Sequence, residues 1–215
     1  MSHDDFAFEP VKGLPERPPE HERILWQGRP STWALARDGF KLNWITGYFA
    51  VIVLWRGSVG AMNDGLVGAF AYGLPYMILW ALAALVIGLM ALTMARATVY
   101  TITTARVAMR IGAALCVTLN IPFKQIANAD LSVKRDGTGN IALDTLGETN
   151  FSYLVLWPHM RPGHIRKTKP ALRCIPDAER VARLLADAAE ARMAMPMIER
   201  RTDKASPTGD LVAAE

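Results

Sequence analysis

Apolar and charged residues are segregated along this chain. Between residues 42 and 95 only Arg56 and Asp64 are charged, whereas the rest of the chain carries charges at the density of an ordinary soluble domain. The stretch 66–94 contains no charged residue at all. Because a membrane-spanning helix needs about 20 mainly apolar residues, this stretch predicts a transmembrane helix and excludes a wholly soluble protein.

The preceding apolar stretch, residues 42–55, is shorter and predicts a first span. It crosses a bilayer only if Lys41 extends to one interface and Arg56 lies near the other. A re-entrant or interfacial helix is the alternative for this stretch. We expect a two-helix transmembrane hairpin over residues 41–95, preceded by a pre-membrane segment over residues 21–40.

After residue 98 the pattern changes to short runs of the kind that form β-strands, bounded by turn residues. The runs are residues 99–103, 106–111, 114–121, 126–135, 140–146 and 150–157. The sequence Asp-Gly-Thr-Gly at residues 136–139 is typical of a hairpin turn. Asp177 is a candidate N-cap for a helix whose apolar residues then recur at helical spacing.

The predicted fold class is therefore membrane α + β. It has two transmembrane helices followed by a small antiparallel β barrel or sandwich with one C-terminal helix, over residues 96–195. Polar composition predicts a mobile arm at residues 1–20 and a disordered tail at residues 196–215.

The distribution of basic residues predicts the orientation in the membrane. Three basic residues lie near each outer end of the apolar stretch, whereas the connecting loop has one. These residues are Arg29, Arg37 and Lys41 before the stretch, Arg96, Arg106 and Arg110 after it, and Arg56 in the loop. The positive-inside rule then places both termini in the cytoplasm. The two cysteines are too few for a disulfide framework and agree with a reducing compartment.

Catalytic and cofactor-binding patterns are missing from the sequence. It has no nucleophile elbow, zinc-protease or P-loop motif. The four histidines, His3, His21, His159 and His164, all lie outside the apolar stretch, so the spans contain no histidine to ligate a pigment metal. We expect no cofactor, no metal, no nucleic-acid partner and no enzymatic activity.

Residues 157–176 form the most distinctive polar segment, because no acidic residue interrupts their basic ones. This segment predicts a docking surface for anionic lipid headgroups or an acidic partner protein, and a solvated connector is the alternative. The candidate binding residues are Arg161, His164, Arg166, Lys167, Lys169 and Arg173.

Two sets of motifs resemble known bacterial proteins. The run from residue 96 to 146, with YTITTARV, IPFKQI and DGTGNIAL, is similar to the bacterial pleckstrin-homology (PH)-like domain. The segment EHERILWQGRP before the spans and the LWPHMRPG and LRCIPDA segments after them resemble the PuhB family of photosynthetic complex assembly proteins of purple phototrophic bacteria. The motif residues are Trp26, Gly28, Arg29, Pro30, Trp157, Pro158, His159, Arg161 and Pro162.

The resemblance implies a non-enzymatic factor that assists assembly of the photosynthetic reaction centre and its core light-harvesting complex. Its implied partners are the reaction-centre H subunit and core antenna subunits in the intracytoplasmic membrane, and self-association is implied as well. Anionic lipid is a further partner that the basic segment predicts. A general membrane-tethered PH-like lipid- or protein-binding module, unrelated to photosynthesis, is the alternative.

Overall fold

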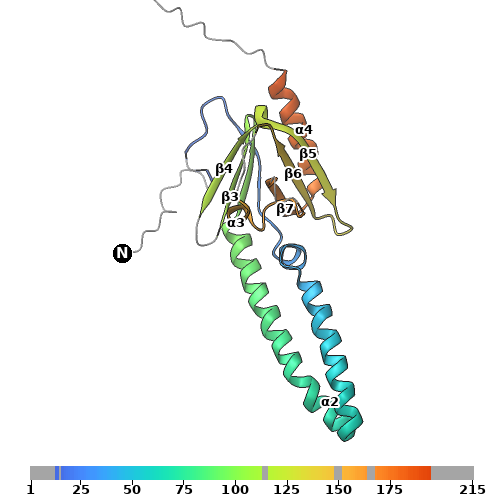
Figure 1. Ribbon diagram of the computed structural model, residues 1–215. Helices are drawn as coiled ribbons and strands as arrows, with labels where there is room; N and C mark the ends of the chain where they lie inside the picture. Colours follow the sequence, from blue (N-terminus) through green and yellow to red (C-terminus); the bar gives the residue numbers. More distant parts are fainter. Residues whose placement is uncertain (1–12, 15, 113–115, 148–151, 164–167, 195–215) are drawn as a thin grey trace, which may run out of the picture.

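The computed structural model describes residues 13–14, 16–112, 116–147, 152–163 and 168–194 (Figure 1). Most of the arm predicted at residues 1–20 and the whole tail predicted at residues 196–215 lie outside these described residues. A long helical hairpin projects from a small domain of two β-sheets and a C-terminal helix.

The apolar stretch forms one helical element, α2 (Leu42–Ala97). Two residues inside it, Asp64 and Gly65, are not helical, and the chain reverses direction there (Figure 1). By length and composition, α2 is the one candidate membrane-spanning helix in the described part of the chain. The prediction of two separate spanning helices is corrected in this respect, because helical structure resumes directly after the two-residue break.

The two arms of α2 lie against each other. Trp80 Nε1 donates a hydrogen bond to Thr46 Oγ1 at 3.1 Å, which joins the middle of the second arm to the start of the first. Near the turn, a Cβ built at Gly60 would overlap the carbonyl group of Gly68. The outward faces of both arms expose large apolar side chains, among them Trp44, Leu54, Phe70 and Leu82.

A short segment leads into α2 and belongs to the β domain. It contains the edge strand β1 (Ile24–Gly28), the single-turn helix α1 (Thr32–Ala34) and one turn of π-helix, η1 (Leu35–Gly39). Leu35 and Ala34 are buried against Ala95 of α2 and Cys174. The pre-membrane segment is therefore packed between the hairpin and the domain.

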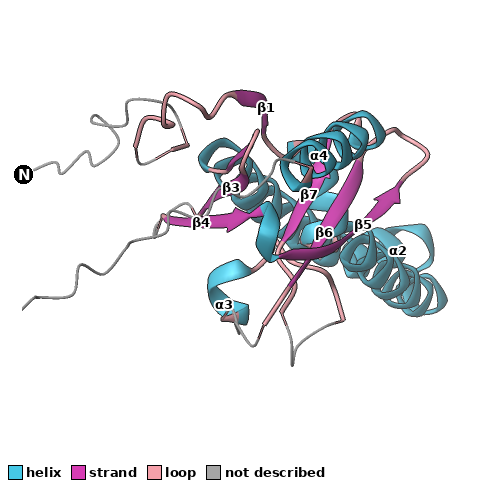
Figure 2. Cartoon of the chain, turned by 90° about the horizontal axis from the view of Figure 1, so that it is seen from above, coloured by secondary structure: helices cyan, strands magenta, loops and turns pink. Residues whose placement is uncertain are grey.

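Two antiparallel sheets make up the domain (Figure 2). The first has strand order β1-β2-β3-β4, and the second has order β5-β6-β7. These strands are β2 (Val99–Thr103), β3 (Arg106–Ile111), β4 (Val117–Pro122), β5 (Ile126–Val133), β6 (Gly139–Thr145) and β7 (Ala171–Ile175). A 3-10 turn, η2 (Phe123–Gln125), connects the sheets.

One core joins both sheets to the C-terminal helix α4 (Ala178–Met193). Tyr100, Met109 and Leu143 from the strands are fully buried, and Val181 and Leu185 of α4 pack into the same cluster. Leu185 follows Val181 by one helical turn, so one face of α4 covers the core while its charged residues face solvent. The predicted antiparallel β domain with one C-terminal helix is confirmed.

Several local predictions are also confirmed. The strands over residues 99–103 and 106–111 have the predicted bounds. The Asp-Gly-Thr-Gly turn joins β5 to β6, and Gly137 takes a φ of 76°, in the region that favours glycine. Asp177 directly precedes α4 as predicted, but its side chain makes no capping hydrogen bond and its φ is 50°.

Three elements differ from the predictions. Residues 150–157 do not form a strand: Tyr153–Leu156 is a single helical turn, α3, and residues 150–151 lie outside the described part of the chain. The strand β7 lies inside the segment predicted to be a loop, where Pro170 and Pro176 flank it. The strand β1 was missed because its five residues carry no clear alternation.

The contact between Gly60 and Gly68 leads to a stability prediction. We expect Gly60→Ala to destabilise the hairpin by about 1–3 kcal/mol, because the added methyl group meets backbone that cannot move aside without separating the arms. Gly88→Ala is the matched control, because nothing lies within 4 Å of its added Cβ. Replacing glycine by alanine within a helix is otherwise favourable by about 0.5–1 kcal/mol. Thermal unfolding of the full chain in detergent measures both, and equal transition temperatures would contradict the contact.

Candidate functional site

The basic segment 157–176 is more neutralised than its sequence predicts. Arg161 forms an ion pair with Asp130 of β5, and Lys169 Nζ lies 2.5 Å from Asp144 Oδ1 of β6. Both acidic partners belong to strands of the second sheet, so the sequence of the basic segment alone does not reveal them. Arg161 and Lys169 are therefore not unopposed cations, and this part of the prediction is corrected.

Arg173 was predicted on the docking surface, but it is buried. It lies in β7, whose five residues are all buried, and it is only 7% exposed. Its guanidinium donates hydrogen bonds to the backbone carbonyls of Pro158, at 3.2 Å, and Asp38, at 3.5 Å. Arg173 therefore ties the segment that leads into α2 to the segment that follows α3. His164, Arg166 and Lys167 lie outside the described residues, so their binding role stays a prediction.

A buried polar cluster joins the end of α2 to the motif residues. We call it the junction, and it consists of Thr98, Tyr100, His159 and Arg173. His159 is 1% exposed; its Nδ1 lies 2.6 Å from the Tyr100 hydroxyl and its Nε2 3.2 Å from Thr98 Oγ1. The Tyr100 hydroxyl also accepts a hydrogen bond from the backbone N–H of Arg173.

The junction suits a neutral histidine. If the Tyr100 hydroxyl accepts from Arg173 and donates to Nδ1, then Nε2–H donates to Thr98, and every ring nitrogen has one partner of the right kind. Burial lowers the pKa of His159 to about 3, and the positive charge of Arg173 acts in the same direction. Burial also raises the pKa of Tyr100. Because both side chains are sealed from solvent, this pair holds the fold together and has no access to a substrate.

The two motif segments meet at this place. Trp157 packs edge-on against Phe40, with ring centroids 5.2 Å apart, and Pro158 follows through a cis peptide bond. The backbone N–H of Ser31 donates to the carbonyl of Cys174 at 2.7 Å, which joins the pre-membrane segment to β7.

The other motif residues surround this contact. Pro30 is buried, while Arg29 and Pro162 are exposed, and Trp26 packs its ring against the backbone of Gly28 and the edge of the core. The motif residues therefore mark the connection between hairpin and domain.

Ion pairs reinforce this connection. Asp38 of η1 pairs with Arg37 and with Lys134, and Arg37 Nη2 lies 2.6 Å from Asp136 Oδ2 in the β5–β6 turn. Burial alone would raise the pKa of Asp38, but hydrogen bonds from Lys134 and Arg37 lower it overall. Hydrogen bonds from Thr138 and Arg37 lower the pKa of Asp136 to about 2. The β5–β6 turn is thus held beside the start of α2.

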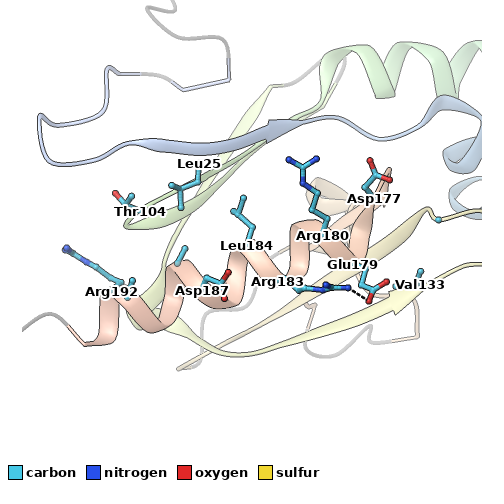
Figure 3. Close-up of a pocket in the computed structure, with 13 residues that line it drawn as sticks. Leu25, Thr104, Val133, Asp177, Glu179, Arg180, Arg183, Leu184, Asp187 and Arg192 are labelled. Atoms are coloured by element: carbon cyan, nitrogen blue, oxygen red, sulfur yellow. Dashed lines mark hydrogen bonds and ion pairs between the residues drawn. The ribbon is translucent and has the colours of Figure 1, made fainter.

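A groove runs along α4 on the solvent side of the domain (Figure 3). We call it the α4 groove; it has a volume of about 980 Å³. Leu25 of β1 and Thr104 lie across from Leu184 of α4, and the Glu179–Arg183 ion pair lies at the end of the groove near Val133. An apolar floor with charges of both signs at its edges suits a segment of another protein better than a small anionic ligand.

Candidate metal ligands and thiols among the described residues are few. Within the described ranges, no three His, Cys, Asp or Glu side chains are placed to hold a metal ion. Cys116 and Cys174 are free thiols, and burial raises the pKa of Cys174, which makes its thiol less reactive.

The environment of His159 leads to a pH prediction. In the unfolded chain a histidine has a pKa of about 6.5, so below that pH the unfolded state binds a proton that folded His159 does not accept. Stability therefore falls as the pH decreases from 6.5 towards 3. For this one group we expect a loss of about 1.4 kcal/mol between pH 7.5 and 5.5, measured by denaturant unfolding of the full chain.

Two histidine variants complete this experiment, one at His159 and one at the other described histidine, His21. His159→Gln should remove most of the pH dependence and also lower stability at pH 7.5, because the junction loses hydrogen bonds. His21→Gln, at an exposed position, should keep the wild-type dependence. A wild-type stability that is flat between pH 7.5 and 5.5 would contradict a neutral, buried His159.

Comparison with known proteins identifies the family. The chain is 47% identical over 202 residues to a 23.7 kDa protein of the puhA 5′ region of Rhodobacter capsulatus, which covers 92% of this chain and 94% of that protein. A crystal structure of a DUF1696 family protein with a pleckstrin-homology domain from Shewanella loihica is 11% identical, with a TM-score of 0.29. That likeness covers 43% of this chain and 71% of the other. The profile of the bacterial PH domain family matches residues 49–189, from the first arm of α2 to the last turns of α4. The chain therefore belongs to the bacterial PH domain family.

Proposed function

We propose that this protein is a non-enzymatic assembly factor for the photosynthetic reaction centre and core light-harvesting complex, as in the PuhB family that its motifs resemble. The observation that carries the proposal is the relative from the puhA 5′ region, because its similarity extends over nearly the full length of both chains. The factor acts by protein–protein contacts made by a PH-like domain that is tethered to the membrane. Its clients are the reaction-centre H subunit and the core antenna subunits.

In this proposal both arms of α2 cross the intracytoplasmic membrane, and both termini are cytoplasmic. The reversal at Asp64 and Gly65 and the contact between the arms support it, since both ends of α2 then emerge at one face of the bilayer. Basic residues near these ends outnumber the single Arg56 near the turn.

The junction gives the tether its mechanical role. Arg173, His159 and the Arg37–Asp136 and Asp38–Lys134 ion pairs fix the domain directly on the ends of α2 instead of on a free linker. A client that meets the domain is therefore held at a defined height and orientation relative to the bilayer. The α4 groove is the surface that we assign to client binding, because its apolar floor is open to solvent.

Membership of the bacterial PH domain family also favours a second candidate function, a general membrane-tethered module for lipids or proteins. The two candidate functions differ in which molecules co-purify with the protein after the membrane is solubilised. Recovery of reaction-centre and core antenna subunits supports the first, whereas lipid-selective binding without these subunits supports the second.

A deletion strain with complementation tests the assembly function and the α4 groove together. A phototrophic strain without this protein should still make bacteriochlorophyll but accumulate less reaction centre and core antenna, as measured by membrane absorption spectra. Leu25→Asp should fail to restore the complexes, because it places a charge on the apolar floor of the α4 groove. Loss of one central apolar contact costs about 1–2 kcal/mol, or roughly tenfold in affinity.

Ile24→Asp is the matched control, because Ile24 is the neighbouring residue of β1 and does not line the α4 groove. The two side chains are similarly exposed, 39% for Ile24 and 41% for Leu25. We expect Ile24→Asp to restore the complexes. Loss of pigment synthesis with stable complex subunits would contradict the assembly function, and equal behaviour of the two variants would remove the α4 groove from it.

Reporter fusions test the topology. A reporter that is active only in the periplasm should give activity when fused after Gly65, at the turn of α2, and none when fused after Ala194. Fusions that are inactive at both sites would show that the arms of α2 do not cross the bilayer.

A further inference from the structure

An unexplained apolar surface lies on α3. Of its residues Tyr153, Leu154, Val155 and Leu156, only Leu156 is buried; Leu154 is 85% exposed and Val155 47%. Trp157, directly after the helix, is 37% exposed. Four of five consecutive residues thus present large apolar or aromatic side chains to the surroundings, an arrangement that an aqueous surface does not favour.

The neighbours of α3 place this surface at the ends of α2. Trp157 packs against Phe40, two residues before α2 begins. His159 hydrogen bonds to Thr98, the residue that directly follows α2. Both ends of α2 therefore contact the residues that directly follow α3, and Figure 1 shows α3 on the side of the domain from which α2 projects.

We infer that α3 is an interfacial anchor, which inserts Tyr153, Leu154, Val155 and Trp157 into the headgroup–acyl boundary of the bilayer that holds α2. The inference rests on the proposed insertion of α2, because the ends of an inserted hairpin lie at that boundary. The occupant of the surface is therefore lipid.

The chemistry of the surface agrees with this occupant. Tyrosine and tryptophan are the residues that membrane interfaces enrich, because their rings combine an apolar body with a polar group. No residue from Ser152 to Pro158 is charged, so the surface offers an acidic or basic protein partner nothing to pair with. Lys41 and Arg96 are exposed at the two ends of α2, and their long basic side chains can reach lipid phosphate groups from an inserted hairpin.

The anchor would complete the attachment of the domain. The junction and the ion pairs hold the domain to one end of the hairpin, and α3 adds a second contact with the bilayer beside it. Together these contacts prevent the domain from tilting about the ends of α2, and a fixed tilt keeps the α4 groove at a constant angle to the membrane.

Depth-dependent fluorescence quenching tests the anchor. The full chain, with Cys116→Ser to remove the exposed thiol, carries a fluorophore on one introduced cysteine and is reconstituted into phosphatidylcholine–phosphatidylglycerol vesicles. The vesicles contain lipids that are spin-labelled either at the headgroup or in the middle of the acyl chain. The test position is Leu154→Cys, and the control is Met193→Cys, which is 70% exposed at the end of α4 far from α2.

We expect the label at residue 154 to be quenched several-fold more by headgroup-labelled lipid than the label at residue 193. Leu85→Cys, 59% exposed on the second arm of α2, reports on the proposed insertion separately, because only an inserted arm is quenched by the acyl-chain label. Quenching at residue 85 with equal, weak quenching at residues 154 and 193 would overturn the anchor and leave the insertion intact. Absence of quenching at residue 85 would overturn the insertion itself. The label at residue 154 could also stay unquenched by lipid in vesicles and yet be shielded from water in native membranes. That result would assign the surface to a protein partner and overturn the anchor.

Discussion

The hydrogen bonds of His159 are the constraint on which the arrangement of this molecule depends. The imidazole ring contacts Thr98 at the end of α2 and Tyr100 inside the first sheet, so one side chain connects the helical hairpin with the core of the domain. A buried ring with both nitrogens satisfied tolerates little movement, because any shift leaves a polar atom without a partner. The domain is therefore held in a fixed position on the hairpin, whereas a flexible linker would let it move.

This fixed attachment explains why the motif residues lie far apart in the sequence. Trp26 and Pro30 precede the hairpin, whereas Trp157 and Pro158 come more than a hundred residues later. In the fold both segments pack around the ends of α2, joined by the hydrogen bond from Ser31 to Cys174 and by the Phe40–Trp157 contact. The motifs thus mark where a PH-like domain is attached to a helical hairpin.

The described basic residues of the segment 157–176 likewise make contacts within the fold. The basic side chains that the structure describes in residues 157–176 are used internally: Arg161 and Lys169 are paired with carboxylates of the second sheet, and Arg173 is buried. Pairing of this kind reduces the attraction that such residues exert on an anionic surface. The exposed apolar side chains on α3 and in the α4 groove are therefore better candidates for intermolecular contact than these three described basic residues.

Sequence alone determined the apolar hairpin, the antiparallel β domain, the β5–β6 turn and the final helix, because each depends on local periodicity or on turn residues such as Gly137. It did not determine the candidate sites. The ion-pair partners of Arg161 and Lys169 are Asp130 and Asp144, which are distant in the sequence. Arg173 is buried because it lies in β7, and the prolines on both sides of this strand had favoured a loop. Likewise, residues 153–156 have the composition of a strand, but in the fold they form a helical turn of which three residues are exposed. Local patterns fix which elements form, whereas charge pairing, burial and the surfaces left open depend on contacts between residues distant in the chain, which only the tertiary structure decides.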